Sequence, residues 1–190
     1  MKSNVKNFYV DRRLGLATLN LDHTLSLPSL NEVELKAKVD SKAKWTIVIY
    51  IAKFWIVSGD LDLCRDGQAI MAIISKKGDV RFKLKLKMTS NGYMREDGII
   101  EFAGVYSLNQ VYARGRRGIM LAIERDGCCH LISVAYGRMS KLQSIDSIVN
   151  VDVNKYKDHR IVTSVIYTGT KDEFIASGYR WSKRITLKLK

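Results

Sequence analysis

The sequence predicts a mainly β protein of the α+β class, built as an antiparallel sandwich or a strongly curved sheet with one or two short helices. Residues 80–88 alternate strictly between apolar and basic side chains, which is the pattern of a half-buried strand. Other apolar runs are rich in β-branched and aromatic residues, and turn signals separate them at short intervals. At 190 residues, 46% of them hydrophobic, the chain is long enough for one domain with a sizeable core.

The N-terminal part is predicted to contain an arm followed by strands. Residues 1–13 show no hydrophobic periodicity, so we expect a flexible arm there and a single β-rich domain over residues 14–190. Residues 14–30 have a period-two leucine pattern with a shifting register, and Pro28 indicates a turn or a sheet edge. Apolar and charged residues alternate over residues 33–39, which predicts an amphipathic strand.

Residues 45–57 are the most apolar stretch, interrupted only by Thr46 and Lys53. The β-branched and aromatic content favours a central strand, but the length also fits a helix, and periodicity does not distinguish the two. The stretch is shorter than the roughly 20 residues that a membrane-spanning helix needs. We expect it to be core or interface, with Trp45 and Trp55 as candidates for self-association or membrane contact.

The second half of the chain carries further strand and turn signals. The clearest turn is Arg125-Asp126-Gly127, because Asp-Gly supplies the positive φ angles of a tight hairpin between residues 119–124 and 128–136. Further strands are predicted at residues 99–108, 144–153, 161–167 and 179–189, and short helices at residues 138–144 and 172–176.

The charge of the chain indicates a polyanionic partner. Thirty-two Lys and Arg residues against 19 Asp and Glu residues give a net charge of +13, and the pI is about 9.7. Nucleic acid, an acidic membrane surface and an acidic protein all fit such a charge. Three cysteines, two of them adjacent, argue against a secreted disulfide framework, and we expect no signal peptide. These features predict an intracellular, reducing environment.

Catalytic and metal-binding motifs are not evident in the sequence. The three histidines lie far apart and outside any nucleophile or zinc motif. On a strand, Cys128 and His130 would point away from Cys129, which leaves too few ligands for a metal. A calcium loop that began at Asp60 would require a glutamate where Met71 stands. We therefore expect no enzyme activity, no cofactor and no metal site.

Three basic features are candidate surfaces for a polyanion. The first is the row of cations in residues 80–88, and the second is a glycine-rich stretch at residues 112–118, expected to be a flexible loop whose guanidinium groups bind phosphates. The third is the C-terminal strand, which has no acid between Tyr179 and Lys190. The candidate polyanion-binding residues are Arg81, Lys83, Lys85, Lys87, Arg114, Arg116, Arg117, Arg180, Lys183, Arg184, Lys188 and Lys190.

Over residues 30–190, the order of these elements resembles the globular part of rhabdovirus matrix proteins, particularly those of plant-infecting viruses: an early amphipathic strand, an apolar aromatic segment, several strands and a basic C-terminal end. Size and pI agree as well. The resemblance implies a virion protein of the host cytoplasm or nucleus that self-associates and bridges the nucleocapsid and an acidic membrane. The chain departs from it in lacking a Pro-rich budding motif, since Pro28 is its single proline, and in lacking a long basic N-terminal tail.

Two functions remain open at this point. One is a non-enzymatic matrix-type protein that forms homo-oligomers. The other is a viral RNA-binding protein, such as a silencing suppressor or a movement protein, without large-scale assembly. Both predict binding to RNA with little sequence preference, because cations that contact phosphates carry almost no information about bases.

Overall fold

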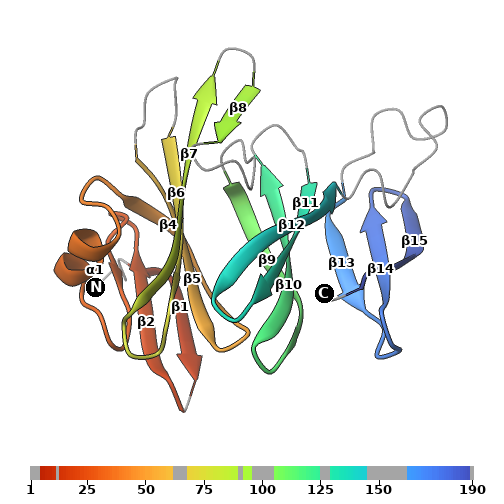
Figure 1. Cartoon of the computed structure of the whole chain (residues 1–190), viewed down its shortest axis with the longest axis horizontal. Coiled ribbons are helices and arrows are strands. Elements are labelled where there is room, and N and C mark those ends of the chain that lie inside the picture. The colour runs from red at the N-terminus through yellow and green to blue at the C-terminus, as the bar shows by residue number, and fades with distance from the viewer. Residues whose placement is uncertain are drawn as a thin grey trace.

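The computed structural model describes residues 5–11, 13–61, 68–89, 92–95, 105–124, 129–144 and 162–188. These residues form four antiparallel sheets and one helix, which confirms the mainly β fold class (Figure 1). The first sheet contains β1 (Val5–Asp11), β2 (Gly15–Asn20) and β3 (Leu25–Ser26), and it is followed by α1 (Glu32–Lys38). The second contains β4 (Lys44–Ile51), β5 (Phe54–Asp60), β6 (Gln68–Ile74), β7 (Val80–Thr89) and β8 (Gly92–Arg95). The third contains β9 (Val105–Arg114), β10 (Arg117–Glu124), β11 (Cys129–Ala135) and β12 (Arg138–Ser144). The fourth contains β13 (Ser164–Tyr167), β14 (Glu173–Gly178) and β15 (Trp181–Thr186).

Three apolar clusters hold the four sheets together in chain order. The first cluster includes Leu35 and Trp55 and lies between the second sheet and the first sheet with α1. The second includes Ile56 and Met120 and lies between the second and third sheets. The third surrounds Phe174 and lies between the third and fourth sheets. The molecule is therefore a stack of sheets in which the second and third are covered on both faces (Figure 1).

Burial on both faces explains why the inner strands are apolar without alternation. In β5, Ile56 faces the second cluster, whereas its neighbours Trp55 and Val57 face the first. Successive side chains of a strand point to opposite faces, so a strand between two cores needs apolar residues at every position. β10 follows the same rule, with Met120 in the second cluster and Leu121 in the third.

The alternating stretch at residues 80–88 forms β7, as predicted. Phe82 and Leu84 pack against the second cluster, and Lys83 is exposed. The pairing of β7 with β6 shifts by one residue next to its start, because Ile73 pairs with Phe82 while the next residue pairs with Val80. The shift is a β-bulge, which re-aims the side chain at the bulged position.

Residues 45–57 form two strands, so the prediction of a single strand or helix is wrong. A two-residue turn at Ala52 and Lys53 separates β4 from β5. Both residues have positive φ angles, 54° and 70°, as in the type I′ turns that fit the twist of a hairpin. Asn and Gly usually occupy these positions, and their absence hid the turn from the sequence pattern.

The predicted contact role of Trp45 and Trp55 is also corrected. Their exposed fractions are 0% and 1%, and both indole rings belong to the first cluster. Tyr50 packs edge-on against Trp55 with ring centroids 5.0 Å apart. In this fold neither tryptophan is available at the surface for another molecule.

The strand expected at residues 33–39 is instead the helix α1. Asn31 caps it, because the side chain of Asn31 accepts a hydrogen bond from the amide of Glu34 at 2.9 Å and the Glu34 carboxylate accepts one from the amide of Asn31 at 2.9 Å. Leu35 and Val39, four residues apart, are buried, while Val33 is 77% exposed. A period-two strand would place Val33 on the same face as the two buried residues, so its exposure agrees with the helix.

The structure settles several further predictions. The pairing of the two strands predicted at residues 119–124 and 128–136 is confirmed by the antiparallel β10 and β11, while the turn predicted at residues 125–127 lies outside the described part of the chain. The helices expected at residues 138–144 and 172–176 are wrong, since these stretches form β12 and most of β14. In β14, Phe174 and Ala176 are both buried in the third cluster, which is the spacing of a strand.

The remaining predictions concern the N-terminal arm and the strands predicted at residues 99–108 and 144–153. Val5–Asp11 form β1, paired with β2, inside the stretch that was expected to be a flexible arm. The strands expected at residues 99–108 and 144–153 extend over residues 99–104 and 145–153, which lie outside the described part of the chain.

Candidate functional site

Four hairpin turns of the second and third sheets meet at one end of the stack (Figure 1, lower edge). In a meander of antiparallel strands every second turn lies at the same end of its sheet. The turns are those between β4 and β5 at Ala52 and Lys53, between β6 and β7 at residues 75–79, between β9 and β10 at Gly115 and Arg116, and between β11 and β12 at Tyr136 and Gly137.

The β9–β10 turn corrects the flexible loop predicted at residues 112–118. β9 continues to Arg114 and β10 starts at Arg117, so only Gly115 and Arg116 lie between the strands. Gly115 has a φ of 62° at the first central position, where a type II′ turn requires glycine. The three arginines are therefore held on an ordered hairpin.

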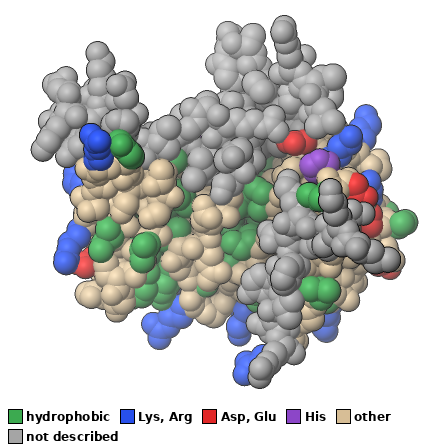
Figure 2. Space-filling model, turned by 180° about the vertical axis from the view of Figure 1, so that it is seen from behind, with side chains coloured by type: hydrophobic (Ala, Val, Ile, Leu, Met, Phe, Trp, Pro, Cys, Tyr) green, Lys and Arg blue, Asp and Glu red, His purple; other side chains and the backbone are tan. Residues whose placement is uncertain are grey.

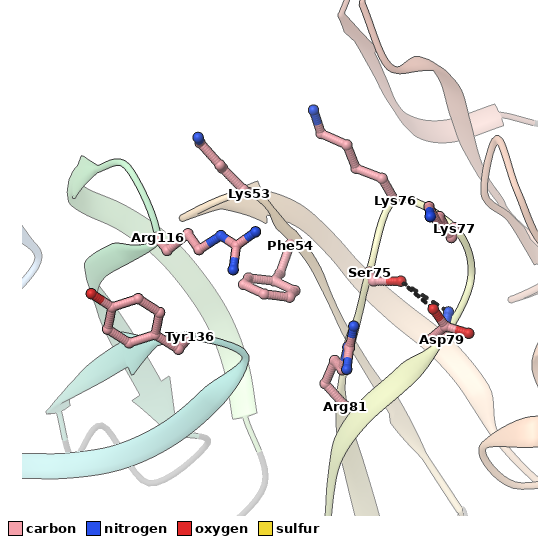
Figure 3. Close-up of a pocket in the computed structure, with 9 residues that line it drawn as sticks. All are labelled: Lys53, Phe54, Ser75, Lys76, Lys77, Asp79, Arg81, Arg116 and Tyr136. Carbon is pink, nitrogen blue, oxygen red and sulfur yellow. Dashed lines mark hydrogen bonds between the residues drawn. The ribbon is translucent and has the colours of Figure 1, made fainter.

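The four turns enclose a cleft of about 610 Å³, which we call the basic cleft (Figure 3). Its lining residues are Lys53, Phe54, Ser75, Lys76, Lys77, Asp79, Arg81, Arg116 and Tyr136. Five of these carry a positive charge and one carries a negative charge. Figure 3 shows that the cations come from two different sheets and that Phe54 lies among them.

The acid of the basic cleft is engaged within its own turn. The hydroxyl of Ser75 donates to the carboxylate of Asp79 at 3.3 Å, and the amide of Asp79 donates back to the hydroxyl at 3.1 Å (Figure 3). Backbone hydrogen bonds between the same two residues and from Gly78 to Ser75 close the turn. Lys76 and Lys77 are thereby displayed on a fixed turn, and both are exposed.

Tyr136 links the turns of the third sheet. Its amide donates to the carbonyl of Arg116 at 3.0 Å, and its φ of 52° places a non-glycine residue in the left-handed region. The guanidinium of Arg117 lies over the Tyr136 ring, 5.4 Å from the centroid, in a cation–π contact. The ring is 61% exposed, so an aromatic face and several cations share this surface.

Gly137 lets the two sheets approach each other at the cleft. A Cβ atom at Gly137 would lie 3.2 Å from the Cβ of Arg81 and 3.2 Å from the ring of Phe54. The φ of Gly137 is 83°, which side chains other than glycine rarely adopt. Both constraints favour glycine, and they bring Arg81 of β7 against the β11–β12 turn.

A second cleft of about 380 Å³ lies between the third and fourth sheets, and we call it the aromatic cleft. Its lining residues are Tyr112, Arg114, Arg117, Tyr167, Lys171, Asp172, Phe174 and Leu187. Three of these carry a positive charge and one carries a negative charge. Tyr112 and Tyr167 have ring centroids 4.5 Å apart, and both rings contact Phe174.

The two clefts are adjacent, since Arg116 lines the basic cleft while its neighbour Arg117 lines the aromatic cleft. We call the two sets of lining residues together the hairpin-end surface. In the space-filling view, Lys and Arg side chains are visible along the lower edge of the molecule (Figure 2). Like charges gathered in clefts create a positive potential that attracts polyanions.

The structure brings part of the predicted polyanion-binding set together. Arg81, Arg114, Arg116 and Arg117 all belong to the hairpin-end surface. Lys188 is exposed and follows Leu187, which lines the aromatic cleft. Residues from three sheets therefore contribute to one end of the molecule.

The predicted row of cations along β7 does not form one surface. Arg81 lies between the second and third sheets, whereas the ammonium of Lys83 donates to the carbonyl of Lys38, next to α1, at 3.3 Å. The β-bulge at the start of β7 accounts for the difference. The side chains of Lys85 and Lys87 lie outside the described part of the structure.

Three other predicted cations of the C-terminal strand, Arg180, Lys183 and Arg184, line neither cleft. Arg184 forms an ion pair with Glu173 at 3.2 Å, and Arg180 lies over the Tyr179 ring at 5.0 Å in the turn at the opposite end of β14. Lys183 is exposed on β15, and Lys190 lies outside the described residues.

Sequence reasoning missed Lys53, Lys76, Lys77, Lys171 and Tyr136 as members of the site. Each lies in or beside a hairpin turn. Lys76 and Lys77 precede Gly78 and Asp79, Tyr136 precedes Gly137, and Lys171 follows Gly169 and Thr170, so turn signals in the sequence accompany these four residues. The turn that contains Lys53 carries no such signal.

No family model matches the chain, and neither a curated protein nor a solved structure is similar to it. Among the described residues, no group of three or more His, Cys, Asp or Glu side chains is placed to hold a metal ion. None of the helices in the described part of the chain is long and apolar enough to cross a membrane.

Proposed function

We propose that this protein is a non-enzymatic nucleic-acid-binding protein whose hairpin-end surface contacts the phosphate backbone of RNA. The observation that carries the proposal is that five cations, four from three hairpin turns and one from β7, line the basic cleft, where the one lining acid is hydrogen-bonded within its own turn. A surface of this composition offers a phosphodiester chain several charge contacts at once.

The chemistry of the lining residues fits phosphate contacts better than base recognition. Lysine ammonium groups act as mobile point charges, and the guanidinium of Arg116 offers a planar fork to phosphate oxygens. The cations sit on strand β7 or on turns whose backbone is fixed by the strands, so the surface is in place before the ligand arrives. We expect strong salt dependence and little sequence preference.

The structure favours this RNA-binding role over the matrix-type role on one specific ground. Self-association was expected through Trp45 and Trp55, and both are buried. The matrix-type role, the contact with an acidic membrane and the virion location stay predictions that rest on element order and charge.

Salt-dependent binding of a single-stranded RNA tests the proposal. If the five cations of the basic cleft each neutralise one phosphate, the slope of log Kobs against log salt is about −3.5. The double variant Lys76→Ala/Lys77→Ala removes two contacts and makes the slope less negative by about 1.4.

The matched control is Lys42→Ala/Lys44→Ala, which removes the same charge from exposed positions at the opposite end of β4. We expect this control to change the affinity little, because its charges lie farther from the cleft than the screening length of about 8 Å at physiological salt. Equal losses in the two double variants, or binding that does not depend on salt, would contradict the proposal.

A further inference from the structure

We propose that the aromatic cleft receives a nucleobase, so that the ligand of the hairpin-end surface is a single-stranded nucleic acid. This inference rests on the proposed function and adds the class of ligand. The basic cleft supplies contacts to phosphate, which single and double strands share, whereas the aromatic cleft supplies a contact that only an unpaired base can make.

The rings of the aromatic cleft form an open apolar site with a buried floor. Phe174 is 1% exposed and packs edge-on against Tyr112, with centroids 6.2 Å apart. Tyr112 and Tyr167 are only half-buried and stand above it, with their ring planes inclined at 55°. The volume of about 380 Å³ lies within the range of about 300–1,000 Å³ typical of small-ligand pockets.

The apolar part of this cleft has basic groups at its edge. Arg114, Arg117 and Lys171 line it beside the two tyrosines. A nucleotide combines an aromatic base with an anionic phosphate, and a ring flanked by cations is complementary to both parts. An apolar ligand without charge would not use the three cations, and a bare polyanion would not use the rings.

Arg117 connects the aromatic cleft with the basic cleft. It lines the aromatic cleft, and its guanidinium lies over Tyr136, which lines the basic cleft. A strand that stacked one base on Tyr112 or Tyr167, whose rings are already in contact with each other, would therefore have its adjoining phosphates next to Arg117 and Arg116. The two clefts form one path on which base and phosphate contacts alternate.

A duplex cannot use this path in the same way. Its bases are paired and stacked inside the helix, and taking one out requires that it be unstacked and unpaired. A duplex would contact only the cations of the surface. At equal phosphate concentration, we therefore expect the hairpin-end surface to bind single strands more tightly than duplexes.

The test compares three ligands of about 12 nucleotides per strand: a single-stranded RNA, an abasic oligonucleotide of equal charge, and a duplex. We expect the full-length protein to bind the single strand more tightly than the abasic strand, and more tightly than the duplex at equal phosphate concentration. Tyr167→Leu keeps an apolar side chain but removes the ring, and it should weaken single-strand binding about 5- to 150-fold while leaving abasic binding unchanged. Tyr167→Phe should retain wild-type binding.

Tyr179→Leu is the matched control, because Tyr179 is 53% exposed and lies in the turn at the opposite end of β14. If the wild type binds abasic and natural single strands equally, and Tyr167→Leu changes neither, the base site is refuted while phosphate binding stands. If none of the three ligands binds, the proposed function fails as well.

A measurement on the wild-type protein avoids any effect of substitution on folding. A single-stranded RNA that contains 4-thiouridine is crosslinked by light, and the modified peptides are identified by mass spectrometry. Crosslinks to Tyr112 or Tyr167 support the base site. Crosslinks confined to other parts of the chain overturn it.

Discussion

Alanine at two adjacent positions of β5 tests the central feature of the fold, which is burial of one sheet on both faces. Ile56 belongs to the cluster between the second and third sheets, and Val57 belongs to the cluster between the first and second sheets. Both have an exposed fraction of 0%. In a sheet with one face in water, one of two adjacent residues of a strand points to the solvent and tolerates substitution. Here we expect the substitution of either residue to lower the free energy of unfolding.

The expected losses follow from the atoms removed. Ile56→Ala deletes three buried carbons at about 0.8 kcal/mol each, and the cavity left behind raises the cost to about 3–4 kcal/mol. Val57→Ala deletes two carbons and should cost about 2–3 kcal/mol. For a chain of this length each kcal/mol lowers Tm by about 2–4 °C, so Ile56→Ala should lower it by about 6–16 °C.

Thermal unfolding followed by circular dichroism measures both changes. Ile166→Ala is the matched control, because Ile166 on β13 is 60% exposed, and its effect should stay within about 0.5 kcal/mol. If either Ile56→Ala or Val57→Ala behaves like this control, one face of β5 is not covered and the stacked arrangement is wrong.

Two further predictions concern local contacts. A Cβ atom at Gly59 would lie 2.7 Å from the carbonyl oxygen of Lys44 and 3.1 Å from the Cα of Trp45. Gly59→Ala should therefore lower the free energy of unfolding in urea by about 1–3 kcal/mol. An unchanged midpoint of urea unfolding would show that β4 and β5 are not this close. The hydroxyl of Thr24 donates to the carboxylate of Asp22 at 2.7 Å, and the amide of Thr24 donates to the same carboxylate at 3.2 Å. These hydrogen bonds lower the pKa of Asp22 below its ordinary value of 3.8. Because the folded state favours the carboxylate, its contribution is complete above about pH 4 and is lost as the pH falls through the lowered pKa. The Tm difference between wild type and Asp22→Ala should therefore be constant from about pH 5 to 7 and shrink below about pH 4, and a difference that persists at the lowest pH would contradict this assignment.

Local patterns in the sequence were sufficient to predict an element of secondary structure where the pattern fits only one kind of element. The alternation in residues 80–88 predicts β7, and Asp126-Gly127 predicts the β10–β11 hairpin. The pattern at residues 33–39 has two interpretations, since residues 35 and 39 share a face in a strand and also in a helix. The cap formed by Asn31 and Glu34 selects the helix, and it was present in the sequence.

The turn at Ala52 and Lys53 shows where local pattern fails. Neither residue favours a positive φ, and the hairpin exists because β4 and β5 gain from pairing and from the two cores they cover. The same burial on both faces removes the alternation by which a strand is recognised. Tertiary contacts therefore decided that residues 45–57 form two paired strands and not one continuous element.

By itself the sequence determined that the chain is mainly β, strongly basic and able to bury a core. Only the tertiary structure decided which cations lie together. Lys53, Lys76 and Arg116 lie far apart in sequence but line one cleft, because a meander returns its alternate turns to the same end and apolar clusters fix the sheets face to face. Lys83 is only two residues from Arg81, yet it lies on the other side of the sheet, because a one-residue bulge reverses the direction of side chains.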